Sequence, residues 1–285
     1  MRRLQYKLDF GKKKTATMLS ISCTHIGNPS VDKEGVHKFM TKAKRYPWIH
    51  HGDIIEGIVR TDKRWSVDEH KDNLLTCMTQ GAQMLSRANK TCIGVIKGNH
   101  DQTPSKEIGD VAEYIANQAK VPYLTAVCFV KFLCPGGSAT GFFAHGSGST
   151  NQLAGEPERR MVNKRIWLRN RLSQFDADLK GMGHVHKFIV APPCYEEKLS
   201  INYSEDNVKR RPSLTRPSWH YAAPSLFKTY DVHADTSNYG EMALYGSTDL
   251  GWIETVFNRD GTIACIREVY SSGKVKQEHY AMIVG

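Results

Sequence analysis

The sequence lacks the features that mark several large classes of protein. No apolar run among its 285 residues is long enough to span a bilayer. The basic start, Met1 to Lys14, has no apolar stretch of the kind found in signal peptides. The 7 cysteines include no CxxC pair, which argues against a zinc ribbon and against a disulfide framework. We therefore expect a reducing cytoplasmic location and no membrane partner.

Motifs of several well-known phosphate and metal chemistries are missing as well. There is no GxxxxGK(S/T) loop, no Cys-x5-Arg thiolate cradle and no HExxH helix. What is present is a composition of 40% hydrophobic and 24% charged residues, sufficient for a sizeable core, and a net charge of +10. This charge favours anionic partners such as nucleic acid or nucleotides. The alternative is a generally basic surface without a dedicated groove.

Strand and helix patterns alternate over the first part of the chain. Apolar runs near 18–23, 48–53 and 92–97 alternate with helical patterns near 30–45, 66–88 and 107–119, which is typical of a mostly parallel sheet with helical crossovers. Later runs at 127–133 with 140–145, and at 252–258 with 262–269, predict two hairpins. Because no linker separates the two halves, we expect a single α/β domain over 1–285, with two mixed β-sheets packed face to face and helices outside.

Two segments differ from the predicted core. Residues 1–16 are predicted to form a polar N-terminal arm, with room for a short edge strand at Leu4–Phe10. Residues 195–217 are polar, charged and longer than most ordered loops. We expect a long polar loop there, either a functional flap or a locally disordered segment.

Polar side chains gather where five predicted strands end. Strand ends of an α/β sheet meet at one edge, so residues that follow different strands can form one site. Imidazole, carboxylate and amide oxygen suit Mn²⁺, Fe²⁺ or Zn²⁺. The number of these possible ligands exceeds what one ion needs, and two ions about 3.5–4 Å apart that share one carboxylate would use them economically. The candidate residues are Cys23, His25, Asp53, Asn99, His100, Asp101, His145, His184 and His186.

These residues also form a series of short motifs in a fixed order. Cys-x-His stands at 23–25, Gly-Asp at 52–53, Gly-Asn-His-Asp at 98–101, His-Gly at 145–146 and Gly-His-x-His at 183–186. The series resembles the calcineurin-like metallophosphoesterase superfamily, in which the first motif is Asp-x-His. The C-terminal third resembles it only in being rich in β-strand patterns. The resemblance implies a four-layer α/β/β/α sandwich and a hydrolase of phosphoric esters with two divalent ions, Mn²⁺ first and Fe²⁺ or Zn²⁺ as alternatives.

The resemblance further implies a role for each residue. His100 is the catalytic histidine and Asp101 would orient it, although the Asp101 carboxylate could also cap the following turn. A bimetal-activated hydroxide would attack phosphorus while His100 protonates the leaving oxygen. By this resemblance the first ion is held by His25, Asp53 and His186, and the second by Asn99, His145, His184 and the bridging Asp53.

Cys23 is the one departure from the family pattern. Its thiolate could bind the first ion, because a neighbouring dication lowers the pKa of a thiol. It could equally be a small buried residue, which would leave the first ion with fewer ligands.

The predicted helix at 158–175 is strongly basic. Met161, Leu168, Leu172 and Phe175 would face the core, while arginine and lysine form an outer stripe. This stripe could contact a phosphate backbone or simply be a solvated face.

Three functions therefore compete on the sequence alone. The first is a phosphomonoesterase or phosphodiesterase acting on a nucleotide or other small anionic substrate. The second is a nuclease similar to repair exonucleases, and the third is a metal-depleted binding scaffold. The small chain length left for a capping domain favours the first.

Overall fold

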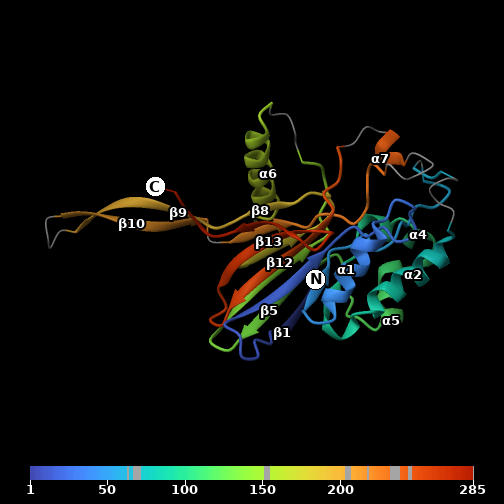
Figure 1. Ribbon diagram of the computed structural model, residues 1–285, viewed down its shortest axis with the longest axis horizontal. Coiled ribbons are helices and arrows are strands. Elements are labelled where there is room, and N and C mark those ends of the chain that lie inside the picture. The colour runs from blue at the N-terminus through green and yellow to red at the C-terminus, as the bar shows by residue number, and fades with distance from the viewer. Residues whose placement is uncertain are drawn as a thin grey trace.

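Two six-stranded β-sheets carry the fold in a computed structural model (Figure 1). The structure describes residues 1–62, 64–66, 72–150, 155–202, 207–216, 218–231, 238–242 and 246–284. Sheet one has the order β1 (Arg2–Lys7), β5 (Val127–Cys134), β6 (Gly137–Ala144), β7 (Leu179–Met182), β11 (Trp219–Ala222) and β8 (Ile189–Ala191). Sheet two has the order β14 (Val275–His279), β13 (Ile263–Tyr270), β12 (Gly251–Asn258), β2 (Thr15–Ile21), β3 (Trp48–His50) and β4 (Cys92–Val95).

Both sheets are mixed, and the strands whose ends carry the motifs run parallel to one another within each sheet. In sheet two, β2, β3 and β4 run parallel, joined by helical crossovers as the sequence predicts. In sheet one, β6 and β7 run parallel, while β5 and β6 form the predicted hairpin. The hairpin of β12 and β13 is also present.

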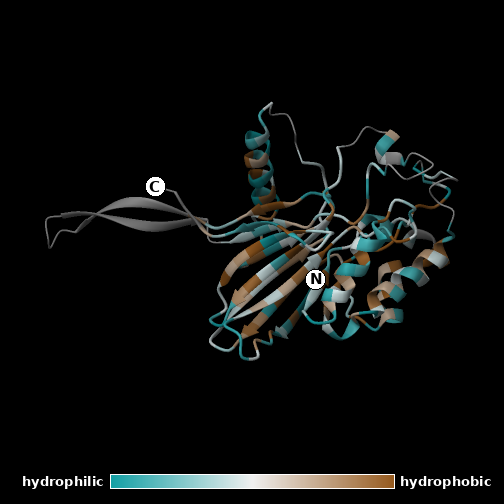
Figure 2. Ribbon diagram, viewed as in Figure 1, coloured by the Kyte–Doolittle hydropathy of each residue, from teal (hydrophilic) through white to brown (hydrophobic). Residues whose placement is uncertain are grey.

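The main core lies between the two sheets. Strands of both contribute fully buried side chains to it, including Met18, Phe132, Phe143, Tyr221 and Phe257. Apolar residues are frequent in these strands, while the outer helices carry both apolar and hydrophilic residues (Figure 2). The face-to-face packing of two sheets is therefore confirmed.

Helices cover the outer face of each sheet. Sheet two is covered by α1 (Lys33–Ala43), α2 (Leu74–Ser86) and α5 (Val111–Ala119), which bury Phe39, Leu85 and Ile115. Sheet one is covered by α6 (Pro157–Arg171), through Leu168 and through Leu172 directly after the helix. The short elements are α3 (Asn99–Gln102), α4 (Ser105–Ile108), α7 (Tyr239–Met242) and a 3-10 turn at Asn89–Thr91. The α/β/β/α layering matches the prediction (Figure 1).

Local sequence explains where the helices on sheet two begin. The carboxylate of Asp32 accepts the amide of Gly35 at the start of α1, and Asp110 accepts the amide of Glu113 at the start of α5. Asn73 caps α2 in the same way, so this helix begins later than the predicted 66–88. Residues 67–71 of that prediction lie outside the described residues.

Residues 195–217 are not a loop where the structure describes them. They belong to β9 (Cys194–Asn202) and β10 (Asn207–Arg216), which pair antiparallel, and β15 (Met282–Val284) pairs with β9. Figure 1 shows these strands as an arm that extends away from the two sheets. The prediction of a long polar loop or flap was wrong here, because these strands lack the apolar alternation that identifies a strand from sequence.

The N-terminal segment is partly integrated into sheet one. Residues 2–7 form edge strand β1, parallel to β5, slightly earlier than the edge strand predicted at 4–10. Leu8 and Phe10 follow it and are buried in the core between the sheets. The assignment of the chain as one domain stays a prediction.

Candidate metal centre

The site is formed where five parallel strands end. Cys23 and His25 follow β2, Asp53 follows β3, and Asn99 and His100 follow β4. From the other sheet, His145 follows β6, and His184 and His186 follow β7. The structure thus brings together every residue that the sequence placed at a strand end, as the topology of parallel strands requires.

Five of these residues have a left-handed backbone, which side chains other than glycine rarely adopt. Their φ angles are Cys23 51°, His25 45°, Asp53 55°, His184 69° and His186 52°. Such conformations cost about 1–3 kcal/mol each and cluster at functional sites. The chain turns sharply at each strand end, and this turn directs the side chains into the site.

One group of ligand atoms converges around Asp53. Nε2 of His145 lies 3.2 Å from Asp53 Oδ2 and 2.9 Å from Asn99 Oδ1. Nδ1 of His184 lies 2.9 Å from the same Asn99 oxygen. Ligand atoms around one ion with bonds of about 2.1 Å are themselves roughly 3 Å apart, so this spacing fits a metal site.

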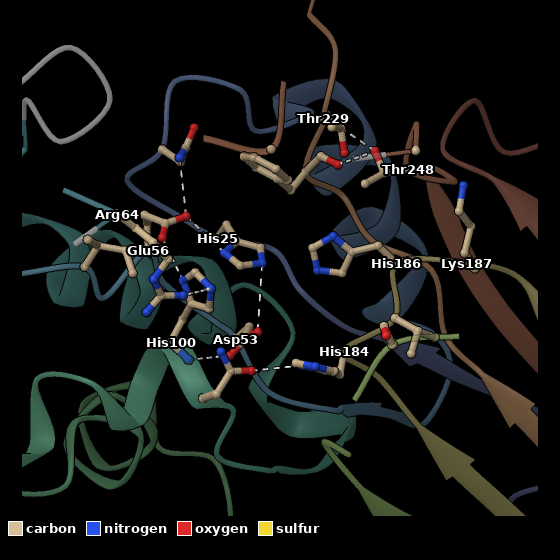
Figure 3. Close-up of a pocket in the computed structure, with 18 of the residues that line it drawn as sticks. His25, Asp53, Glu56, Arg64, His100, His184, His186, Lys187, Thr229 and Thr248 are labelled. Carbon is tan, nitrogen blue, oxygen red and sulfur yellow. Dashed lines mark hydrogen bonds and ion pairs between the residues drawn. The ribbon is translucent and has the colours of Figure 1, made fainter. Parts of the chain in front are cut away.

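A second group lies on the other side of Asp53. Cys23, His25 and His186 have ligand atoms within 4.8 Å of one another. Nε2 of His25 is buried, has no hydrogen-bond partner and lies 4.0 Å from Asp53 Oδ2. A buried nitrogen of this kind normally has a partner, and a cation between His25, Asp53 and His186 would provide one. Figure 3 shows His25, Asp53, His184 and His186 directed toward a common centre.

Glu56 is the residue that sequence reasoning missed. Its Oε2 lies 3.0 Å from Nδ1 of His25, and its Oε1 lies 2.7 Å from Nδ1 of His100. The carboxylate is buried, and Asn28 donates a further hydrogen bond to it. Because each ring uses Nδ1 for Glu56, both Nε2 atoms point away from this carboxylate and can serve another partner. Glu56 could have been noticed as an acid placed directly after two apolar residues, Ile54 and Ile55.

Asp101 does not contact the ring of His100, so the predicted role of orienting it was wrong. The buried Asp101 carboxylate accepts four backbone amides, those of Asp53, Ile54, Ile55 and Gly98, at 2.9–3.2 Å. It thereby fastens the loop after β3 to the loop after β4. The alternative prediction, that Asp101 caps the following turn, describes part of this function. Gly98 is the residue before α3, and the Asp101 carboxylate accepts its amide. A side chain at Gly98 would collide with Asp53 Oδ1, so the two loops are in close contact.

Low pKa values keep two of the histidines neutral, the state in which an imidazole can bind a cation. Burial, with the charge of His145, lowers the pKa of His184 to about 4, and burial with the charge of His25 holds the pKa of His186 well below its usual range. Both rings are therefore neutral, as a ligand must be. Burial lowers the pKa of His145, but Asp53 outweighs it and raises the value overall. A metal ion would take the place of that proton.

His100 has the opposite environment. Burial lowers its pKa, but the charges of Glu56 and Asp53 outweigh it and raise the value to about 9. Arg64 acts against this shift, with Nη1 of the guanidinium 3.1 Å from Nε2 of His100. Arg64 is in turn held by Asp62, with Nη2 to Oδ2 at 2.7 Å.

Cys23 lies inside the second group but is fully buried. Its Sγ is 3.0 Å from Ser22 Oγ, and burial together with the charge of Asp53 holds the pKa of the thiol well above its usual range. Both the ligand and the packing interpretations of Cys23 remain compatible with this geometry. His50 and His51 are buried behind the site; Nδ1 of His145 contacts the backbone oxygen of His51 at 2.6 Å.

A cavity of about 610 Å³ opens over the two groups. The residues that line it include His25, Asp53, Arg64, His184, His186 and Lys187, which Figure 3 labels, and also Phe227. Such a volume accommodates a small anionic molecule or one segment of a longer chain.

No protein-family model matches the chain, and no curated protein matches it. Solved structures that are similar to the chain include three with 12–14% identity. A phosphoesterase, YfcE from E. coli, has 12% identity and a TM-score of 0.41, covering 93% of this chain and 98% of its own. GAP50, the anchor in the inner membrane complex of Plasmodium, has 14% identity and a TM-score of 0.44, and the match covers 96% of this chain and 90% of GAP50. A metallophosphoesterase from Sphaerobacter thermophilus has 13% identity and a TM-score of 0.37, and the match covers 89% of this chain and 88% of its own. Within the described residues, no helix has the length and apolar character needed to cross a membrane.

Proposed function

We propose that the chain is a calcineurin-like metallophosphoesterase that hydrolyses a phosphate mono- or diester with two divalent ions. The observation that carries this proposal is the pair of ligand groups that share Asp53. One holds Asn99, His145 and His184 at metal-ligand spacing, and the other contains the unpartnered Nε2 of His25. The ions, with Mn²⁺ as the first candidate and Fe²⁺ or Zn²⁺ as alternatives, would activate the attacking water and neutralise charge on the phosphate.

The chain itself supplies the proton for the leaving group. His100 lies at the cavity wall, and Glu56 and Asp53 hold its pKa at about 9, so the ring carries a proton at neutral pH. Glu56 accepts the Nδ1 proton, which directs the Nε2 proton toward the cavity and makes it available to the leaving oxygen. Protonation of Nε2 also ends its role as an acceptor for Arg64. The guanidinium is then free to bind a phosphate oxygen.

Hydrolysis of aryl phosphate esters tests the proposal. The metal-stripped chain should hydrolyse neither p-nitrophenyl phosphate nor bis(p-nitrophenyl) phosphate, and added Mn²⁺ should restore turnover of at least one. Elemental analysis should find two ions in the active protein. Turnover in EDTA, or none with Mn²⁺, Fe²⁺ or Zn²⁺, would contradict the proposed function.

A further inference from the structure

The basic face of α6 lies next to the cavity. Arg171, near the end of this helix, donates to Ser147, and Gly148, Ser149 and Thr150 line the cavity wall. Lys187 directly follows the ligand candidate His186 and lines the cavity from the other side. α6 thus contacts the rim of the site through Arg171 and Ser147, although it belongs to the outer layer.

Several positive charges accumulate along this route. Burial lowers the pKa of Lys164, and so do the nearby charges of Lys187, Arg160 and Lys276, with Asp249 acting against them. Charges that shift one another in this way are close neighbours. Among the described residues, Arg159, Arg160 and Lys164 make no ion pair with a carboxylate. We call Arg159, Arg160, Lys164 and Lys187 the basic ridge.

Like charges that lie close together and form no ion pair repel one another, and a bound anion would relieve this repulsion. From Arg159 to Lys164 α6 rises by about 8 Å, and Lys187 continues the ridge to the cavity wall. A ligand that contacts the whole ridge and also enters the cavity must carry several phosphates along a chain. Nucleic acid has this chemistry, with one negative charge per nucleotide.

We propose that the basic ridge binds the phosphate backbone of a single-stranded nucleic acid and leads one of its phosphodiesters into the cavity. A single strand fits better than a duplex because the site is recessed, with His25 and Asp53 only 2% and 1% exposed. A membrane surface fits less well. Val162 and Ile166 are the only large apolar side chains exposed on α6, all of which is described, and they do not form the continuous apolar face of a membrane helix.

Binding can be measured apart from cleavage. The metal-loaded full chain is titrated into a fluorescent thymidine strand of about twelve nucleotides with phosphorothioate linkages, which are cut slowly, over a range of salt. The ridge variant carries Arg159→Gln, Arg160→Gln and Lys164→Gln. Its control carries Arg87→Gln, Lys90→Gln and Lys120→Gln, the same charge change at exposed positions on the other helical layer.

The ridge variant should bind roughly 10–100-fold more weakly at low salt, with a log–log salt slope smaller by about 2, since each phosphate contact contributes about 0.7. The control variant should bind like the unmodified chain. Equal weakening of both variants, no binding by the unmodified chain, or stronger binding to duplex or to phosphatidylserine vesicles would overturn the proposal.

Only the fate of the bound strand rests on the proposed function. With an ordinary phosphodiester strand, metal-dependent cleavage should be slower in the ridge variant than in the control. If neither protein hydrolyses the aryl esters with any ion, the proposed function fails, while the salt titration still decides whether the ridge binds a strand. If the aryl esters are hydrolysed but both variants bind the strand equally, the ridge proposal alone fails.

Discussion

Glu56 Oε1 lies 2.7 Å from Nδ1 of His100, while the other oxygen of the same carboxylate contacts His25. One buried side chain therefore orients both the proposed proton donor and a proposed metal ligand. This arrangement links the two halves of the proposed mechanism.

Replacing Glu56 by glutamine should impair both functions. The amide cannot stabilise a protonated His100, so turnover of an aryl phosphate diester should fall roughly 10²–10³-fold. Loss of the carboxylate behind His25 should also weaken binding of one ion by about 10–100-fold. Steady-state kinetics at saturating Mn²⁺ and metal titration measure the two effects separately. Glu113→Gln, at an exposed position of α5, is the matched control, and equal behaviour of the two variants would refute this role of Glu56.

His100→Ala and Asp53→Asn should differ in metal content. Loss of the proton donor should reduce turnover by roughly 10²–10⁴ and leave both ions in place. Asp53→Asn removes the charge shared by both ligand groups, and asparagine tolerates the left-handed backbone at this position. Elemental analysis should therefore find both ions depleted. Identical metal contents in the two variants would show that the roles assigned to His100 as proton donor and to Asp53 as metal ligand are wrong.

Asp101→Asn should act on stability first. The buried carboxylate accepts four backbone amides, and an asparagine places its own NH₂ donors against some of them. We expect the free energy of unfolding to fall by about 2–4 kcal/mol, measured by urea denaturation. A variant with unchanged stability but reduced turnover would restore the role in orienting His100.

Cys23 can be tested by spectroscopy, because its full burial shields the thiol from alkylating reagents whether or not a metal is bound. If its thiolate is a ligand, the Co²⁺-loaded protein should show a sulfur-to-cobalt charge-transfer band that Cys23→Ser abolishes. Cys23→Asp should retain both ions and shift preference toward Mn²⁺. Absence of the band in the unmodified protein would identify Cys23 as a packing residue.

The metal-free protein should lose stability as pH rises. The pKa of His100 is about 9 in the folded chain and near 6.5 when unperturbed, so its contribution is complete below pH 6.5 and is lost as pH approaches 9. Urea denaturation in EDTA should show this decline, and Glu56→Gln should remove much of it. A pH-independent stability over this range would contradict the ion pair.

The sequence predicted the parts of the site that follow from topology. Residues after parallel strands must meet, so the sequence alone places His25, Asp53 and His145 together. The partner of His100 could not be deduced in the same way. Glu56 reaches it because the loop after β3 packs against the segment after β4. Asp101 holds the two together through backbone amides, which carry no sequence pattern. The arm of β9 and β10 was missed because its polar strands contain no apolar period.

The left-handed backbone lowers the stability of the folded chain at the same positions that supply the side chains of the site. These positions are Cys23, His25, Asp53, His184 and His186. Glycine would be conformationally relaxed at each of these positions, yet it would remove the side chain that the site needs. Selection of this protein for heat resistance alone should therefore enrich glycine or asparagine at the strand ends and progressively inactivate it. Any engineering of a more stable form would need to search elsewhere, in the helical layers, and hold these turns fixed.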